Sequence, residues 1–407
     1  MELLDMCMDF CCTLDDMLGY PQDPEHDGEM SKYVIEQPFM NIETARYEDN
    51  GVVIDGIWRR MRELLEFLRW IIITGDEQTF DRMLKLVIYG GDMFKHCIPW
   101  PGEMHLTSHH CAVVYLTWWD PLLKIFPHYL GRERVTKVFT VTHWNHHDQF
   151  LLVFVEAVRR YFREVLAHDW MEQRAGIAAA VRNNHSLNLL FQFMLQDGIP
   201  YVALRNLLRM SPSPERRAHI DKFYPYLCAR FRAHNKFHYS CLTVHAMFIK
   251  NYLQDDIVAV IDAMYCQSCK GHPGRNTALD GLMEKINKLA KQMVHGIATE
   301  ERVAAVVPWI NVIEPVESGW QKLYPNYAED GRAYIGAPNY DVDIAMLVEW
   351  FREHIGRDFA SATAFSNYDV FRGRSGIGLV SPWEHIERAY TDDIAYAHAK
   401  CAECVFR

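Results

Sequence analysis

Two carboxylates, Asp280 and Glu284, stand one helical turn apart in the stretch GHPGRNTALDGLMEKINKLAKQM. Residues four positions apart lie on one face of a helix, so both side chains could reach a single metal ion. The loop before them, GHPGRN, holds two glycines and a proline and ends in Arg275 and Asn276. Such a loop can bring backbone N–H groups and a cation to a phosphate at the start of a helix.

The same residues also suit an ordinary amphipathic helix. Thr277 is a natural N-cap, and Asp280 stands at the capping-box spacing from it. Glu284 and Lys288 have the spacing of a helical ion pair. An apolar face runs along the helix through Leu279, Met283, Ile286, Ala290 and Met293. This interpretation accounts for the helix without a ligand, but it leaves the loop and its Arg275 unexplained.

A further candidate acid, Asp76, follows a short apolar run. Ile71 to Ile73 and the stop at Gly75 and Asp76 predict a buried β-strand. An acid just past the carboxyl end of such a strand is where α/β proteins place ligand and metal groups. The alternative is an aspartate in a tight turn, or at the N-cap of a helix that begins with EQTFDRM.

Two groups of histidines could also do chemistry. The segments PGEMHLTSHHC and HWNHHD contain His105, His109, His110, His143, His146 and His147. His105 and His109 have the spacing that places two histidines on one face of a helix. Neither segment matches a zinc signature such as H-E-x-x-H, so surface or polar-core histidines are the default interpretation. A zinc-dependent hydrolase that uses these histidines is a third candidate function.

Two Cys-x-x-Cys pairs, Cys266 with Cys269 and Cys401 with Cys404, could together bind a structural zinc. The pairs lie far apart in the sequence, and Cys266 falls in what resembles the end of a helix. We therefore expect that they do not share a zinc ion. The chain has 11 cysteines at irregular spacing, which favours reduced thiols in an intracellular protein.

The composition is that of a folded globular protein. The chain has 407 residues, of which 49% are hydrophobic, and a net charge of −11. This charge argues against a surface that is basic throughout, but it leaves room for a local basic groove. No run of about 18 apolar residues occurs, so we expect no membrane span. The start, MELLDMCMDF, lacks the pattern of a secretory signal.

Helical periodicity dominates the chain. It appears in DGIWRRMRELLEFLRW and in several segments between residues 136 and 263, whereas PWPGE is typical of a loop. We predict four parts. These are an N-terminal part of an α/β core at 1–135, a helical insertion at 136–263, a returning core helix with its loop at 264–330, and a C-terminal helical or irregular extension at 331–407.

Four segments follow one another along the chain in the order ITGDEQTFDRM, WPGEMHL, AHNKFHYS and CKGHPGRNTALDGLMEKINKLAK. Together they resemble an uncharacterised domain of eukaryotic proteins encoded by, or derived from, DNA transposons. The matched segments lie between about residues 42 and 294. The most specific match is the last loop and helix, where the fitting residues are Gly271, Pro273, Gly274, Asn276, Asp280, Met283, Glu284 and Asn287.

The resemblance implies a transposase core of the ribonuclease-H-like kind. The fold class would be mixed and predominantly α-helical, with a small α/β core, complete or incomplete, that a large helical insertion interrupts. Asp76 would be the second catalytic acid and Glu284 the helical one, and both would bind Mg²⁺ or Mn²⁺. His105, Arg275, Asn276, Asp280 and Asn287 would support the site or bind substrate. The reaction would be metal-dependent phosphodiester cleavage and strand transfer on DNA in the nucleus.

The chain departs from the family's pattern at three points. After Gly-Asp, Glu77 and Gln78 replace the usual Gln-Leu. The histidine that follows the helical glutamate is Lys285 here, and the first acid has no clear position, although Asp9, Asp15 and Asp16 are available. These departures keep open a decayed transposase. They also keep open a competing function of another class, a non-catalytic helical scaffold that binds proteins or self-associates.

Overall fold

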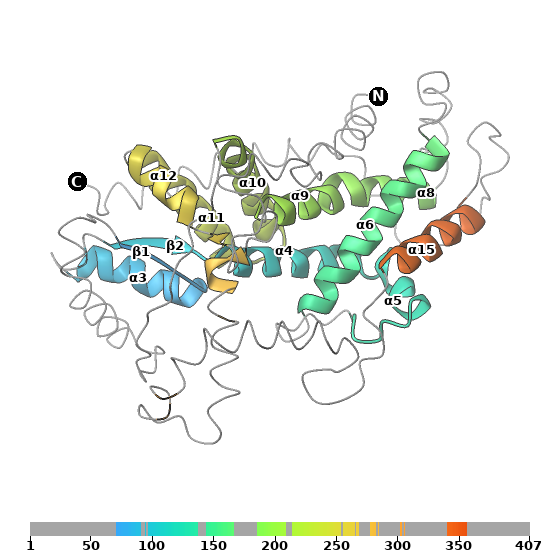
Figure 1. The fold of residues 1–407 in the computed structure, drawn as a ribbon, viewed down its shortest axis with the longest axis horizontal. Coiled ribbons are helices and arrows are strands. Elements are labelled where there is room, and N and C mark those ends of the chain that lie inside the picture. The colour runs from blue at the N-terminus through green and yellow to red at the C-terminus, as the bar shows by residue number, and fades with distance from the viewer. Residues whose placement is uncertain are drawn as a thin grey trace.

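The computed structural model describes residues 71–90, 94, 97–136, 144–166, 185–208, 214–253, 255–264, 266–267, 277–281, 284, 302, 305 and 340–355. The described part is predominantly helical and contains a small parallel strand pair, which confirms the coarse fold class (Figure 1). The predicted helix in DGIWRRMRELLEFLRW and the three N-terminal candidate acids lie outside the described residues.

The elements follow one another mainly as helices. In chain order they are β1 Ile71–Gly75, α3 Glu77–Tyr89, β2 Cys97–Pro101, α4 Glu103–Trp118, η2 Leu123–Ile125, α5 Phe126–Tyr129, α6 Trp144–Leu166, α8 His185–Phe193, η4 Met194–Gly198, α9 Ile199–Leu207, α10 Pro214–Ala233, α11 Phe237–Tyr252, α12 Asp255–Met264, β3 Cys266–Gln267, β4 Thr277–Ala278 and α15 Tyr340–His354. Strands β1 and β2 pair in parallel, and β3 and β4 form a separate antiparallel pair.

The predicted strand at 71–75 is confirmed as β1, but it is only half-buried at residues 72–75. The fully buried strand is its partner β2, where the sequence pattern predicts a loop. That expectation was wrong because the two prolines do not interrupt the ladder. Gly102, just after β2, donates its N–H to Gly75 O (2.9 Å). By the alternation of a strand, the nitrogens of Pro99 and Pro101 therefore face away from β1, where no ladder hydrogen bond is required.

Helix α3 covers the strand pair with one apolar face. Its buried residues, Phe80, Met83, Leu86 and Val87, recur at helical spacing. Phe80 packs with Ile98 and Trp100 of β2, while the other three form a small cluster with Cys97. The unit β1–α3–β2 is therefore a parallel strand pair with a helical connection.

The central helix is α4. It is buried on several sides, since its buried residues include the five consecutive positions 111–115. Leu106 and Val113 belong to the apolar cluster that contains β2 and α9–α12. Val114, Tyr115 and Trp118 belong to a second cluster with α6, α8, α9 and α15. Figure 1 shows α4 running from the strand pair at one end of the molecule toward α6 and α15 at the other.

The predicted helical block at 136–263 is confirmed for the described residues of that range, which contain six α-helices and the π-helical turn η4 but no strand. Helices α9–α12 pack in the same apolar cluster as β2 and α4. The helical block and the strand pair therefore share one core.

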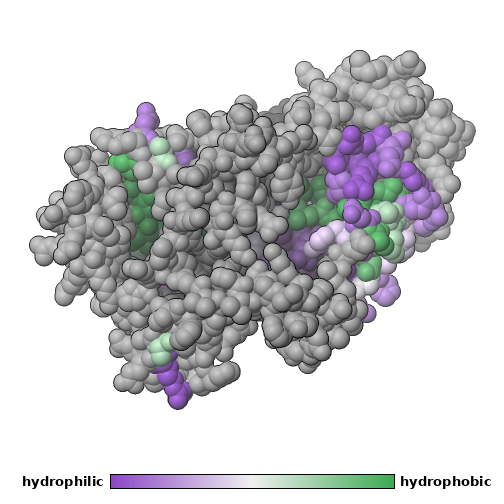
Figure 2. Space-filling view, viewed as in Figure 1, coloured by the Kyte–Doolittle hydropathy of each residue, from purple (hydrophilic) through white to green (hydrophobic). Residues whose placement is uncertain are grey.

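Helix α15 is attached to α6 by aromatic packing and by ion pairs. Phe351 contacts Phe126 and Phe154, with ring centroids 5.7 Å and 5.9 Å apart. An ion pair joins Arg352 of α15 to Glu164 of α6. Figure 2 shows hydrophilic residues gathered over this end of the molecule. Among the described helices, none is both long and apolar enough to cross a membrane.

Candidate functional site

Asp76 occupies the position directly after β1 and begins α3. Its Oδ1 accepts a hydrogen bond from the N–H of Thr79 (2.8 Å), which makes Asp76 the N-cap of α3. The cap uses only one carboxylate oxygen, and Oδ2 makes no hydrogen bond to the described residues. The side chain thus serves the helix and still has an oxygen available at the carboxyl end of the strand.

Asp280 caps a different helix from the one in which it was expected to act. Helix α4 begins after Gly102, which has no side chain with which to cap it. Asp280 provides the missing acceptor: its two oxygens accept the N–H groups of Met104 (3.1 Å) and His105 (3.0 Å). The side chain is almost completely buried, at 4% exposure. A buried carboxylate needs such donors, and a helix N-terminus also favours its negative charge.

The capping-box interpretation of Asp280 was therefore wrong. Thr277 lies in β4, where it pairs with Gln267, and is not the residue before the first helical position, Leu279. The side chain of Asp280 contacts a helix that lies 175 positions earlier in the chain. Cys266 likewise begins β3 and does not end a helix.

The close approach of Asp280 requires a glycine at position 102. A Cβ placed on Gly102 would lie 2.2 Å from Oδ2 of Asp280 and 2.6 Å from the carbonyl oxygen of Gly75. Both distances are far below van der Waals contact. The absence of a side chain at Gly102 thus allows the ends of β1 and β2 and the Asp280 carboxylate to meet.

His105 lies where these elements converge. Its Nδ1 is 2.9 Å from Oδ2 of Asp280, so the ring donates this hydrogen to the carboxylate. Burial lowers the pKa of His105, but the hydrogen bond and charge of Asp280, together with the charges of Asp76 and Glu284, outweigh it and raise the pKa above its usual value. The charges of Asp76 and Glu284, which are far apart in the sequence, therefore both act on this ring, although less than Asp280 does. Nε2 of the ring makes no hydrogen bond to the described residues and can act on a ligand.

We predict that His105 titrates above the usual histidine pKa of about 6.5 in the intact protein. In the Asp280→Asn variant the pKa of His105 should fall, because one of the negative charges that oppose the effect of burial is then missing. Smaller decreases are expected in Asp76→Asn and in Glu284→Gln. The measurement is an NMR titration of the imidazole carbon-bound protons, with Asp81→Asn on the exposed side of α3 as the control. An unchanged pKa in all three variants would show that the carboxylates do not converge on this ring.

A second layer of the site comes from α11. His109, one turn along α4 from His105, stacks on Tyr239 with ring centroids 3.7 Å apart. Its Nδ1 is 3.3 Å from Nζ of Lys236. Burial first, and then the charges of Lys236 and His105, lower the pKa of His109 to about 3, so the ring is neutral and accepts from the ammonium group. The His105–His109 face of α4 is thus lined by acids at one end and by a lysine at the other.

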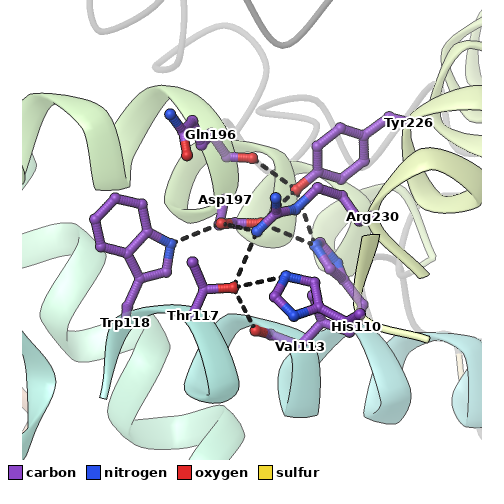
Figure 3. Close-up of polar contacts among 9 residues, drawn as sticks. His110, Val113, Thr117, Trp118, Gln196, Asp197, Tyr226 and Arg230 are labelled. Atoms are coloured by element: carbon purple, nitrogen blue, oxygen red, sulfur yellow. Dashed lines mark hydrogen bonds and ion pairs between the residues drawn. The ribbon is translucent and has the colours of Figure 1, made fainter. Parts of the chain in front are cut away.

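Deeper in the helical block lies a buried polar cluster around Asp197 (Figure 3). Arg230 donates to both carboxylate oxygens, through Nε (2.8 Å) and NH2 (2.6 Å). Trp118 and Tyr226 donate to the same carboxylate at 2.6 Å and 2.9 Å. Burial raises the pKa of Asp197, but Arg230 and the other partners outweigh it and hold the pKa below its usual range. Because the carboxylate is fully paired, we assign this cluster a structural role: it joins α4, η4 and α10.

His110 belongs to this cluster and is fully buried. Its Nε2 lies 3.0 Å from the Tyr226 hydroxyl, whereas Nδ1 has no hydrogen-bond partner in the described part of the chain. Burial lowers the pKa of His110 to about 4, with Asp197 opposing and Arg230 adding to this effect. His147 is also buried, as the polar-core interpretation expected, while His143 lies outside the described residues.

The low pKa of His110 predicts acid sensitivity. The unfolded chain takes up a proton near pH 6.5 and the folded chain only near pH 4, so stability is lost as pH falls from about 6.5 toward 4. One such histidine costs about 2 kcal/mol at pH 5 relative to pH 7.5. Urea unfolding at the two pH values should show this loss, and His110→Gln should reduce it. An equal pH dependence in His110→Gln would refute the assignment.

The structure leaves part of the predicted site undescribed. Arg275, Asn276, Asn287 and Lys288 lie outside the described residues, as do Cys269, Cys401 and Cys404. Glu284 is described as a helical residue with an exposed side chain. Lys236 and Tyr239 were not among the predicted site residues, although their segment, AHNKFHYS, was part of the resemblance.

The donor chemistry of the acids suits Mg²⁺ or Mn²⁺. Mg²⁺ commonly binds one or two carboxylates together with water and substrate phosphate oxygens. Asp76 and Glu284 can provide such carboxylates, whereas both oxygens of Asp280 already accept from α4. Across the described residues, no group of three or more His, Cys, Asp or Glu side chains is arranged to hold a metal.

Comparison with protein-family models, with curated proteins and with solved structures gives no match to this chain.

Proposed function

We propose that this chain is a transposon-derived protein that acts on DNA, with its phosphodiester-handling site at the carboxyl ends of β1 and β2. The observation that carries the proposal is that the charges of Asp76 and Glu284 both act on His105, whose Nδ1 lies 2.9 Å from Oδ2 of Asp280. In the sequence, Asp76 precedes the long helical block and Glu284 follows it. This is the order that the resemblance to transposon proteins implies. The carboxyl end of parallel strands is also where α/β folds bind their ligands.

The fold supports the same proposal. A strand followed by Asp76, a helical insertion and a returning helix with Glu284 is the order expected of a ribonuclease-H-like core. The shared apolar cluster of β2, α4 and α9–α12 provides a rigid base for the site. A eukaryotic protein of this kind would work in the nucleus.

Each side chain has a distinct part in the proposed reaction. Asp76 and Glu284 would hold a divalent cation, which when bound neutralises phosphate charge and activates the attacking oxygen. Asp280 orients His105 through Nδ1, so that Nε2 can donate to a phosphate or leaving oxygen. Gly102 allows Asp280 to reach this position.

A plasmid-nicking assay tests the proposal. With Mg²⁺ or Mn²⁺, the intact protein should convert supercoiled DNA to the nicked form. Asp76→Asn and Glu284→Gln should each reduce the rate by at least about 100-fold, since each removes a ligand worth several kcal/mol of charge stabilisation. Asp81→Asn, which alters only an exposed ion pair with Lys85, should leave the rate unchanged.

A second candidate, a non-catalytic scaffold that retains a decayed nuclease site, is favoured by a different observation. In the described part of the chain, no third acid completes a metal cluster, and the third nearby acid, Asp280, already serves α4. If the intact protein does not nick DNA with either metal, or if the acid variants nick as well as the intact protein, the nuclease proposal fails and the scaffold remains.

A further inference from the structure

We propose that the turn between α10 and α11, residues 232–238, is a docking surface for the phosphate backbone of duplex DNA. The turn presents Arg232, Lys236 and His238 beside the carboxylate site. The proposal rests on the proposed function for the identity of the polymer, and it adds the residues that would bind and position it.

The sequence around the turn has an unusual charge distribution. Between Asp221 and Asp255 there is no aspartate or glutamate, although the chain as a whole has a net charge of −11. The lysines, arginines and histidines of this segment are Lys222, Arg230, Arg232, His234, Lys236, His238, His245 and Lys250. A local basic region in an acidic protein is the electrostatic pattern expected of a surface that binds a polyanion.

The structure separates the structural cations of this segment from those at its surface. Arg230 is paired with buried Asp197 at 2.6 Å, and Lys250 with buried Asp262 at 3.0 Å, so both serve the core. Arg232 is exposed, and the side chain of His238 is 83% exposed. Lys236 is half-buried, with its ammonium group directed at His109. The turn thus carries an exposed guanidinium group, a half-buried ammonium group and an exposed imidazole.

Lys236 is the centre of this surface. Its ammonium group lies 3.3 Å from the neutral ring of His109, which accepts a hydrogen bond without cancelling the positive charge. Burial lowers the pKa of Lys236 below its usual value, and a phosphate oxygen at the ammonium group would oppose this effect. The ammonium group also has further N–H donors to offer such an oxygen. The ring of Tyr239 stacks on His109 and fixes the acceptor in place.

The turn also has a fixed position relative to the acids. His109 is one helical turn along α4 from His105, and His238 lies 3.5 Å from Glu77, the residue after Asp76. Asn235 has a φ of 58°, in the left-handed region that asparagine tolerates, and gives the turn a defined shape. Nε2 of His234 lies 3.0 Å from Oγ1 of Thr117 on α4. A phosphate at Lys236 would therefore lie next to the His105 site.

Repeated cations along a turn suit a polymer better than a single phosphate. Duplex DNA carries one charge per about 1.7 Å of helix axis, so neighbouring phosphates can contact neighbouring side chains. Such contacts position the backbone without reading the bases. We therefore expect binding that depends on salt and tolerates any sequence.

Fluorescence anisotropy with a labelled duplex tests this surface, using the full chain in EDTA so that no divalent metal contributes. Arg232→Glu and Lys236→Glu should each weaken binding by at least about tenfold, and each should lower the slope of log K against log salt by about 1. Lys236→Ala should weaken binding less, and it guards against misfolding of the charge-reversed variant. Lys124→Glu, an exposed lysine of η2, is the matched control and should bind as the intact protein does.

The result separates this proposal from the nuclease proposal. Unchanged binding in Arg232→Glu and Lys236→Glu, or equal weakening in Lys124→Glu, would overturn the docking surface even if the protein nicks DNA. If only the two turn variants bind more weakly and the protein does not nick DNA, the docking surface is supported. In that case only the nuclease proposal is refuted.

Discussion

Replacing Asp197 with alanine should destabilise the fold by about 3–5 kcal/mol, because it leaves the largely buried Arg230 guanidinium without its carboxylate partner. Asp197 is fully buried and accepts from Arg230, Trp118 and Tyr226. Three elements, α4, η4 and α10, lose their common acceptor at once. The same substitution should loosen the α10–α11 turn, which follows Arg230 directly.

Urea unfolding followed by circular dichroism measures this loss. The matched control is Asp81→Ala, which removes an exposed ion pair with Lys85 and should cost at most about 1 kcal/mol. A loss for Asp197→Ala no greater than that of the control would mean that the buried cluster does not hold the helices together.

Replacing Gly102 with alanine is the second substitution from which we expect a large effect. The new Cβ would overlap a backbone carbonyl of Gly75 and the carboxylate of Asp280, so one of them must move. Overpacking of this kind costs about 1–3 kcal/mol. Because the backbone of β1 is fixed by its ladder, we expect Asp280 to be displaced and the pKa of His105 to fall with it.

Gly131→Ala provides the control for this experiment. Gly131 has a φ of 65°, and a Cβ added there would meet no atom within 4 Å, so alanine brings backbone strain of about 1–2 kcal/mol but no overlap. Both variants should lose stability, but only Gly102→Ala should change the NMR titration of His105. A normal His105 titration in Gly102→Ala would show that Asp280 does not depend on this glycine.

Local sequence patterns predicted strand β1 and the helical block, but not strands β2, β3 and β4. The β-branched run before Gly75 predicted β1, and the apolar periodicity between residues 136 and 263 predicted the helical block. Both signals arise from neighbouring residues, so they survive without knowledge of the tertiary structure. Strand β2 was missed because its prolines suggest a loop. Only the pairing with β1 shows that the proline nitrogens face away from the ladder, so that they are compatible with a strand.

The arrangement of the site could be predicted only in part. The resemblance to transposon proteins named Asp76, His105, Asp280 and Glu284 together, and the three acids all raise the pKa of the His105 ring. Local capping rules placed Asp280 on its own helix, whereas its true partners lie 175 and 176 positions away. Such a contact depends on packing between distant segments. The acid-free segment around Lys236 was visible in the sequence, but only the structure places it beside the carboxylates.

The central claim is that Asp76 and Glu284 together bind a divalent cation beside His105, and paramagnetic broadening by Mn²⁺ tests it most directly. Substoichiometric Mn²⁺ should broaden the imidazole signal of His105 before that of His354, which lies on α15 at the other end of the molecule (Figure 1). In the double variant Asp76→Asn, Glu284→Gln, this selective broadening should disappear. If His105 keeps its signal at saturating Mn²⁺, or broadens equally in the double variant, the two acids do not form a metal site.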